Sequence, residues 1–150
     1  MAVVSELRKC HPLFMKLTFK GAGIILNQGI ITELKSYQIL FKEGFAESVV
    51  FIVLYGRAVL RKSKDGVLGL VGVGDSIGEE AILMPKYRFR LESCVGEGNS
   101  CLLEFDRNKI GELKVNLNSL RLKADYNIFI SLLKRSFNRK QNWRSLKRLH

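Results

Sequence analysis

Glycines divide the middle of this chain into short β-rich runs, and this feature constrains the fold more than any other. The glycines are Gly44, Gly56, Gly66, Gly74 and Gly78, at intervals of 12, 10, 8 and 4 residues. Around and between them lie YQILF, SVVFIVLY, RAVLRKS and VLGLVGV. Runs rich in Val, Ile, Phe and Tyr at this spacing favour an antiparallel sandwich or barrel, and SKDG is a hairpin turn signal. The runs FRLESCV and CLLEFDR predict two further strands.

Both ends of the chain are predicted to be helical. Ser5 is a candidate cap before SELRKCHPLFMKL, which Pro12 interrupts, whereas GAGIILNQGIITELKSY is ambiguous between a helix and short extended pieces. After Asp106, RNKIGELKVNL predicts a short helix. Apolar residues spaced by three and four from Leu120 to Phe137 predict one long amphipathic helix. The fold class is therefore mainly β with flanking helices: a jelly-roll-like antiparallel β-barrel with N-terminal helices and a long C-terminal helix.

Composition limits the class of protein. The chain has 150 residues, 47% of them hydrophobic, which suits one domain with a sizeable core. We divide it into an N-terminal helical segment (1–35), a β-barrel (36–107) and C-terminal helices with a basic tail (108–150). The longest apolar run falls far short of the roughly 20 residues of a membrane helix, and the first residues lack the apolar core of a secretory signal. A soluble, cytoplasmic protein is expected.

Cysteine and histidine are too sparse to predict a disulfide framework or a metal site. Cys10, Cys94 and Cys101 are an odd number without a close pair, which fits a reducing compartment. The histidines, His11 and His150, lie near the termini, so neither a metal site nor a Ser–His–Asp arrangement is expected. The sequence also has no Gly-Lys-Ser/Thr phosphate loop. We therefore expect no enzymatic activity and no cofactor.

Positive charge gathers at the C-terminal end. The net charge is +11, and residues 101–150 contribute +8, with 12 Lys or Arg against 4 Asp or Glu. From Lys134 onward seven residues are basic and none is acidic. Such a tail could meet nucleic acid, an acidic membrane surface or an acidic partner protein, or form a solvated helix face. A solvated face or a partner protein is favoured over nucleic acid.

One stretch of the middle region carries candidate chemistry, namely GDSIGEEAILMPKYRFR, residues 74–90. Gly78 lets the backbone come close to a ligand. Residues Glu79 to Leu83 could form a short helix whose unpaired N–H groups bind an anion, because the helix dipole favours negative charge. Arg88, ten residues after Gly78, could pair with that anion in a charge-assisted hydrogen bond.

From about Ser36 to Arg107 the sequence resembles the cyclic nucleotide-binding domain family. LFKEGFAESVVFIVLYGRAVL is similar to the family's strand, glycine turn, strand and glycine. VGVGDSIGEEAIL is similar to its glycine–aspartate turn and Gly-Glu-x-Ala phosphate cassette, and CLLEFDR to the strand that closes its barrel. Several motifs in order are more specific than a lone Gly-Glu-x-Ala. The resemblance implies a barrel that binds cAMP or cGMP, as in protein kinase A regulatory subunits and catabolite activators.

The resemblance also implies roles for individual residues. Ala81 and Ile82 would offer N–H groups to the cyclic phosphate, and Arg88 would neutralise its charge. Glu79 would accept a hydrogen bond from the ribose 2′-hydroxyl. The implied ligand site comprises Gly78, Glu79, Glu80, Ala81, Ile82, Arg88 and Phe89. Arg88→Ala is accordingly expected to abolish cyclic nucleotide binding and to leave the fold intact.

In the family a residue of the C-terminal helix caps the base. Tyr126, Phe129 and Phe137 are the candidates in this chain. For any one of them, ordinary packing of an amphipathic helix on the barrel is the favoured explanation.

The chain departs from the family just after the cassette arginine. Phe89 and Arg90 stand where small residues are usual, and Phe89 in place of threonine favours cAMP over cGMP. Glu80 stands where an aliphatic residue is frequent, although glutamate is tolerable on an exposed helix face. On a strand Arg90 would share a face with Glu92. Arg90 could thus add phosphate affinity, fill the pocket, or pair with Glu79 or Glu92.

Two functions are open on this sequence. One is a stand-alone, non-enzymatic sensor that binds cAMP, less readily cGMP, and signals through or docks to a partner protein by its C-terminal helix and basic tail. The alternative is a ligand-silent structural or adaptor subunit of a larger assembly, for example a ciliary or cytoskeletal one. A DNA-reading helix-turn-helix is disfavoured, because only about 40 residues follow the barrel and no second and third helix is evident.

Overall fold

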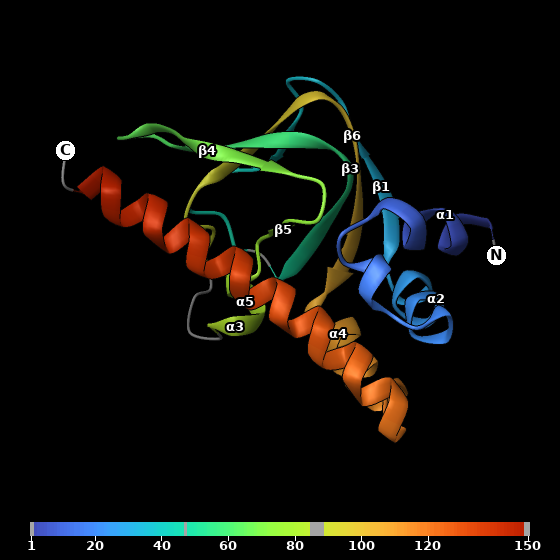
Figure 1. The fold of residues 1–150 in the computed structure, drawn as a ribbon. Coiled ribbons are helices and arrows are strands. Elements are labelled where there is room, and N and C mark those ends of the chain that lie inside the picture. The colour runs from blue at the N-terminus through green and yellow to red at the C-terminus, as the bar shows by residue number, and fades with distance from the viewer. Residues whose placement is uncertain (1, 47, 85–88, 149–150) are drawn as a thin grey trace.

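The computed structural model describes residues 2–46, 48–84 and 89–148. Within these ranges, six strands form one antiparallel sheet, which curls above a long C-terminal helix, with the N-terminal helices at one end (Figure 1). The strands are β1 (Ile30–Leu34), β2 (Ile39–Phe41), β3 (Val49–Lys62), β4 (Gly66–Gly72), β5 (Ser76–Ile77) and β6 (Ser93–Asp106). The helices are α1 (Ala2–Cys10), the 3₁₀ helix η1 (Phe14–Lys16), α2 (Phe19–Gln28), α3 (Glu80–Leu83), α4 (Arg107–Asn116) and α5 (Leu120–Arg148). The predicted fold class is confirmed.

The two longest strands, β3 and β6, form the spine of the sheet. They pair from Val49↔Asp106 to Arg61↔Ser93, with β1 and β2 on the other edge of β6 and with β4 and β5 on β3. The register shifts twice, between Val53 and Tyr55 and between Tyr55 and Arg57, next to Gly56, which has a φ of +83°. Such irregularities bend a strand and allow one sheet to curl on itself.

Element boundaries differ from the sequence expectation in four places. Helix α1 begins at Ala2, before the predicted cap at Ser5. The ambiguous GAGIILNQGIITELKSY contains most of α2 and all of β1, so the sheet begins at Ile30 and not at Ser36. The two predicted strands FRLESCV and CLLEFDR are one strand, which begins only at Ser93. Gly96 does not interrupt it, because glycine there admits the backbone of Lys35: an added Cβ would lie 2.2 Å from the Lys35 carbonyl oxygen.

Alternation along the strands creates two cores. On β3 and β6, Ile52, Leu103 and Phe105 face the helices, while Phe51 and Leu102 face the barrel interior. This period of two is the geometry of an extended strand. One face of the sheet therefore holds the N-terminal helices and the first half of α5, and the other face closes over itself.

Helix α5 is the longest described element and spans the molecule (Figure 1). With 29 residues it is about 43 Å long at 1.5 Å per residue. Near its start the buried carboxylate of Asp125 accepts hydrogen bonds from the N–H (2.9 Å) and the hydroxyl (2.6 Å) of Thr18, the cap of α2. No described helix is long and apolar enough to cross a lipid bilayer.

His11 fixes the N-terminal segment to the sheet. Its buried ring donates from Nε2 to the Val53 carbonyl at 2.8 Å, and its Nδ1 accepts the Leu13 N–H at 3.1 Å. Both bonds require the neutral ring protonated on Nε2. Burial lowers the pKa of His11 from 6.5, and the hydrogen bond to Val53 opposes this only in part.

This arrangement predicts a loss of stability in mild acid. The unfolded chain takes up a proton on His11 near pH 6.5, whereas the folded chain does so only at lower pH, so the unfolded state binds more protons in between. The stabilisation is present above pH 6.5 and is lost as the pH falls through the lowered folded pKa. Urea unfolding at pH 7.5 and 5.5 should show a free energy of unfolding lower by about 1 kcal/mol at pH 5.5. His11→Gln should remove most of this difference and His150→Gln should keep it; an unchanged difference in His11→Gln would contradict the assignment.

Candidate functional site

The predicted cassette lies at the turn between β5 and α3. Strand β5 pairs with β3 through Phe51↔Ile77, and the chain then turns at Gly78 with a φ of +79°. A Cβ at Gly78 would lie 2.0 Å from Nη1 of Arg90 and 2.9 Å from the Val49 carbonyl oxygen. Glycine is therefore required here both by its backbone conformation and by the close approach of an arginine.

Arg90 brings a buried guanidinium to this glycine. Its Nη2 donates to the Val49 carbonyl at 2.7 Å, and its Cζ lies 4.0 Å from the centroid of the Phe41 ring, a cation–π distance. Its backbone is bonded on both sides to the preceding loop, to Gly44 and Phe45. The guanidinium is thus held from several directions in one place beside the cassette.

The arginine predicted to neutralise the phosphate, Arg88, lies outside the described residues, so its role stays a prediction. Phe89, also predicted in the site, is 62% exposed and forms an isolated bridge with Ala46. Arg90 and Glu92 are both buried, which agrees with the predicted alternation, although the regular strand starts after them.

The N–H groups predicted to bind an anion already have partners. Ala81 N–H donates to the Gly78 carbonyl at 3.2 Å, and Ile82 N–H donates to the Glu79 carbonyl at 3.0 Å. Arg107 fixes the same short helix by two hydrogen bonds to the Ala81 carbonyl, at 3.1 and 2.8 Å. An incoming phosphate would have to share these N–H groups with the turn.

Glu79, the predicted ribose partner, is held by helix α5. Its side chain is 0% exposed, and Nζ of Lys140, 2% exposed, donates to its two oxygens at 2.6 and 2.8 Å. The Ser76 hydroxyl donates to the same carboxylate at 3.0 Å. Burial raises the pKa of Glu79, and the positive charge of Lys140 opposes that rise. Lys140 also donates to the Ser76 carbonyl at 2.7 Å, so it joins α5 to the cassette at two points.

Glu80 is not on an exposed helix face, and that expectation was wrong. Its buried carboxylate accepts from Nη2 of Arg144 at 2.7 Å, and the same nitrogen donates to Glu92 at 2.6 Å. Burial would raise the pKa of Glu80, but the charges of Lys140 and Arg144 outweigh it and lower that pKa. Burial likewise opposes the charge on Arg144, whereas its bonds to Glu92 and Glu80 raise its pKa.

Lys140 and Arg144 are the site residues that the sequence did not reveal. They were part of the basic tail expected to face solvent or a partner protein, yet both are buried inside the fold. Their spacing of four places them on one side of α5. Together with Arg90 they supply three cations to the region that buries three carboxylates, Glu79, Glu80 and Glu92. The cluster joins α5 to the barrel through charge.

The predicted base caps lie elsewhere in this structure. Phe129 is fully buried, with its ring centroid 5.5 Å from that of Phe105 and edge-on to it, and Tyr126 packs against the same core. Base capping by either residue stays a prediction. The aromatic residue of α5 that lies over the sheet is Trp143: a Cβ at Gly69 of β4 would be 2.7 Å from its ring.

The family model of the cyclic nucleotide-binding domain matches residues 31–115, which is more than half of the chain. The chain belongs to the cyclic nucleotide-binding domain family. The match contains the glycine-punctuated strands, the cassette, Arg90 and Glu92, whereas Lys140 and Arg144 lie beyond its end. No curated protein sequence matches the chain.

Solved structures of the family share this fold. A cyclic nucleotide-binding protein from Geobacter metallireducens GS-15 is 16% identical, with a TM-score of 0.69, covering 94% of this chain and 99% of that one. A cyclic nucleotide-binding domain from Methylobacillus flagellatus KT is 20% identical, with a TM-score of 0.66, covering 94% and 78%. The regulatory domain of Toxoplasma gondii PKA, crystallised with cAMP, is 25% identical, with a TM-score of 0.59, covering 73% and 42%.

Proposed function

We propose that this chain is a non-enzymatic regulatory module that binds a cyclic nucleotide beside Gly78, cAMP in preference to cGMP. One observation carries the proposal: the guanidinium of Arg90 is buried and fixed against the cassette glycine. A cation held in place before the ligand arrives suits a compact anion such as a cyclic phosphate, because little ordering is left to be done on binding. We assign the phosphate contact to Arg90.

Binding of a nucleotide ribose to Glu79 would have to change the hydrogen bonds that Glu79 now accepts. A ribose hydroxyl can reach this carboxylate only if Lys140 yields at least one of its two hydrogen bonds. Since Lys140 is part of α5, the nucleotide would alter how the end of α5 lies on the barrel. A ligand shifts such an equilibrium by its differential affinity for the two positions. The output of the module would then be the position of α5, read by a partner protein.

Trp143 offers a direct readout, because it is the only tryptophan of the chain and lies on α5 three residues after Lys140. Its ring packs on Gly69, and the guanidinium of Arg139 lies 5.0 Å from the ring centroid. We expect saturating cAMP to shift the emission maximum of Trp143 to longer wavelength, because water reaches a ring that lifts from β4. The measurement is a fluorescence titration. Binding without any spectral change would contradict the movement of α5.

Calorimetric titration with cAMP and then cGMP tests the proposal, with non-cyclic 5′-AMP as the control nucleotide. We expect a micromolar dissociation constant for cAMP, on the order of −8 kcal/mol, weaker binding of cGMP, and no binding of 5′-AMP at the same concentrations. No heat and no fluorescence change at millimolar cAMP would overturn the proposal.

A ligand-silent adaptor is the second candidate function, and the closed cluster favours it. Glu79 already accepts two hydrogen bonds from Lys140 and one from Ser76, and the N–H groups of Ala81 and Ile82 are bonded within the turn. In this case Lys140 occupies the hydrogen-bonding position at Glu79 that a ribose hydroxyl would take. The barrel then serves only as a rigid surface to which a partner protein docks. The same titration separates the two functions: a silent protein gives no heat with either cyclic nucleotide and leaves the fluorescence of Trp143 unchanged.

A further inference from the structure

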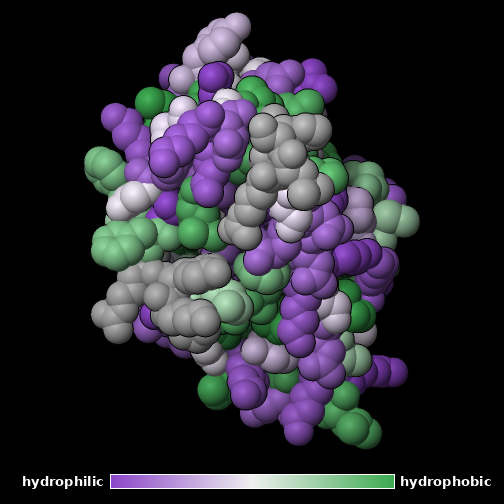
Figure 2. Space-filling view, turned by 90° about the vertical axis from the view of Figure 1, so that its left-hand side faces the viewer, coloured by the Kyte–Doolittle hydropathy of each residue, from purple (hydrophilic) through white to green (hydrophobic). Residues whose placement is uncertain are grey.

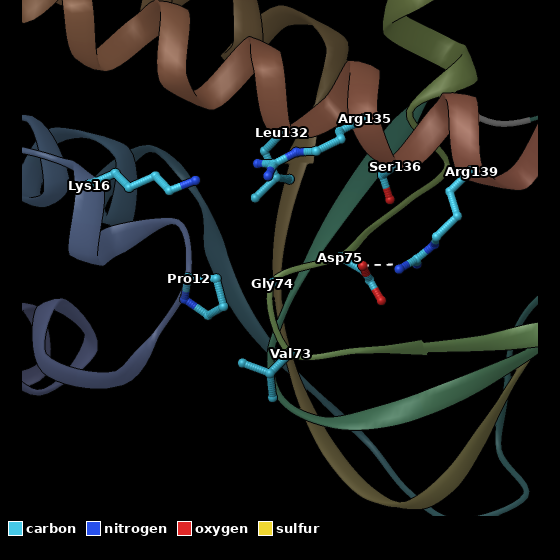
Figure 3. A pocket seen from close by; sticks show the side chains of 9 residues that line it. All are labelled: Pro12, Lys16, Val73, Gly74, Asp75, Leu132, Arg135, Ser136 and Arg139. Carbon is cyan, nitrogen blue, oxygen red and sulfur yellow. Dashed lines mark ion pairs between the residues drawn. The ribbon is translucent and has the colours of Figure 1, made fainter.

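A cavity lies between the N-terminal segment, the β4–β5 turn and α5. Its volume is about 290 Å³. Three separate parts of the chain line it: Pro12 and Lys16 around η1; Val73, Gly74 and Asp75 between β4 and β5; and Leu132, Arg135, Ser136 and Arg139 on α5 (Figure 3). Pro12 and Val73 on one side and Leu132 on the other supply its apolar lining (Figure 3). Its size lies at the lower end for ligand pockets, so it suits a small ligand.

The cavity is rigidly built on the barrel side. Asp75 accepts the Gly72 N–H at 2.7 Å, and its carbonyl accepts the Val53 N–H at 2.9 Å. Gly74 has a φ of +89°, and a Cβ there would lie 2.9 Å from the ring of Pro12. The turn and the N-terminal segment are thus in direct contact, and the space between them and α5 is shaped before any ligand enters.

Charge in the cavity is unbalanced. Asp75 is its single acidic lining residue, and that carboxylate is already paired with Arg139 at 2.8 Å. The two other cations that line the cavity are Lys16 and Arg135. Neither forms an ion pair with any carboxylate of the described residues 2–46, 48–84 and 89–148. Figure 3 shows their side chains reaching over the cavity from η1 and from α5, with the charged ends pointing toward one another. Like charges that converge repel, and an anion between them would turn that repulsion into two attractions.

We propose that this cavity is an anion site for a small phosphate-bearing ligand, held between Lys16 and Arg135. The ligand would join the N-terminal segment to the middle of α5, where no ion pair between described residues joins them now. Because both cations are exposed, affinity would be modest and would fall with salt. Among the described residues, neither Arg90 nor any residue of the predicted nucleotide site lines this cavity.

Inorganic pyrophosphate is the probe, and calorimetry at low ionic strength with the full chain is the measurement. We expect Lys16→Gln/Arg135→Gln to weaken binding at least about tenfold, since both charge-assisted contacts are lost. The control is Lys64→Gln/Lys123→Gln, which removes the same net charge at two exposed positions away from the cavity. Arg90→Ala should bind pyrophosphate as the wild type does.

The controls also define failure. If the Lys64/Lys123 variant weakens binding as much as the Lys16/Arg135 variant, pyrophosphate responds only to the net charge of +11, and the proposal falls. If Arg90→Ala abolishes binding and Lys16→Gln/Arg135→Gln does not, the probe enters the nucleotide pocket, and the proposal falls as well. If the wild type does not bind cAMP, the proposed function fails, but the pyrophosphate results still decide whether this cavity binds an anion.

Discussion

Arg90→Ala is expected to weaken cAMP binding at least about hundredfold, and Arg88→Ala, which removes the cation predicted from the sequence, tests whether a second arginine shares the phosphate contact. Truncating one partner of a buried, charge-assisted contact costs roughly 2–5 kcal/mol, and about 2.7 kcal/mol corresponds to a factor of one hundred. The guanidinium of Arg90 lies against Gly78. Calorimetric titration of both variants with cAMP is the measurement.

Two further variants make this comparison decisive. Arg90→Lys keeps the charge but not the planar fork, so we expect an intermediate affinity. Thermal unfolding of each variant must show a single cooperative transition, because Arg90 also packs on Phe41 and bonds Val49. Loss of binding in Arg88→Ala with full binding in Arg90→Ala would return the phosphate contact to Arg88, as the spacing from Gly78 first predicted.

Lys140→Met is expected to lower the free energy of unfolding by roughly 3–5 kcal/mol, because it leaves a buried carboxylate without its cation. Glu79 has no exposed surface from which water could compensate. Urea unfolding measures the change. Lys134→Met, an exposed position of the same helix, is the matched control and should alter stability by no more than about 0.5 kcal/mol.

A second substitution separates the ion pair from simple packing. In Lys140→Met/Glu79→Gln the stranded charge is gone, so we expect the double variant to recover much of the stability lost in Lys140→Met. The coupling energy from the four proteins of this cycle isolates the Glu79–Lys140 interaction. Additive effects of the two substitutions would show that Lys140 contributes through its aliphatic chain and not through its charge.

Local patterns predicted the barrel well. Period-two runs in β3 and β6 place residues such as Ile52 and Leu102 on opposite faces, and Gly56 and Gly78 do have the positive φ angles that only glycine adopts easily. These properties belong to a few neighbouring residues. They can therefore be read from the chain without knowing what lies across the fold.

The charge cluster could not be predicted in this way. Glu79 and Lys140 are 61 residues apart, and nothing local tells a buried lysine of an amphipathic helix from an exposed one. The contact of Arg90 with Gly78 was not predicted either, because the spacing from Gly78 pointed to Arg88, whose role stays a prediction. Glu80 looked exposed for the same reason, because its partner Arg144 comes from the far end of the chain.

The hydrogen bonds between Thr18 and Asp125 have a mechanical consequence for α5. They pin the first turns of the helix to α2, and buried Phe129 and Leu133 hold the next turns by apolar contacts. The last turns are held by the charged contacts of Lys140 and Arg144 and by the packing of Trp143 on Gly69. If those contacts open, α5 behaves as a cantilever. Its first turns stay fixed at Asp125, and the displacement grows along the helix and is largest at its C-terminal end. Amide exchange should then accelerate after Lys140 while the turns around Asp125 stay protected.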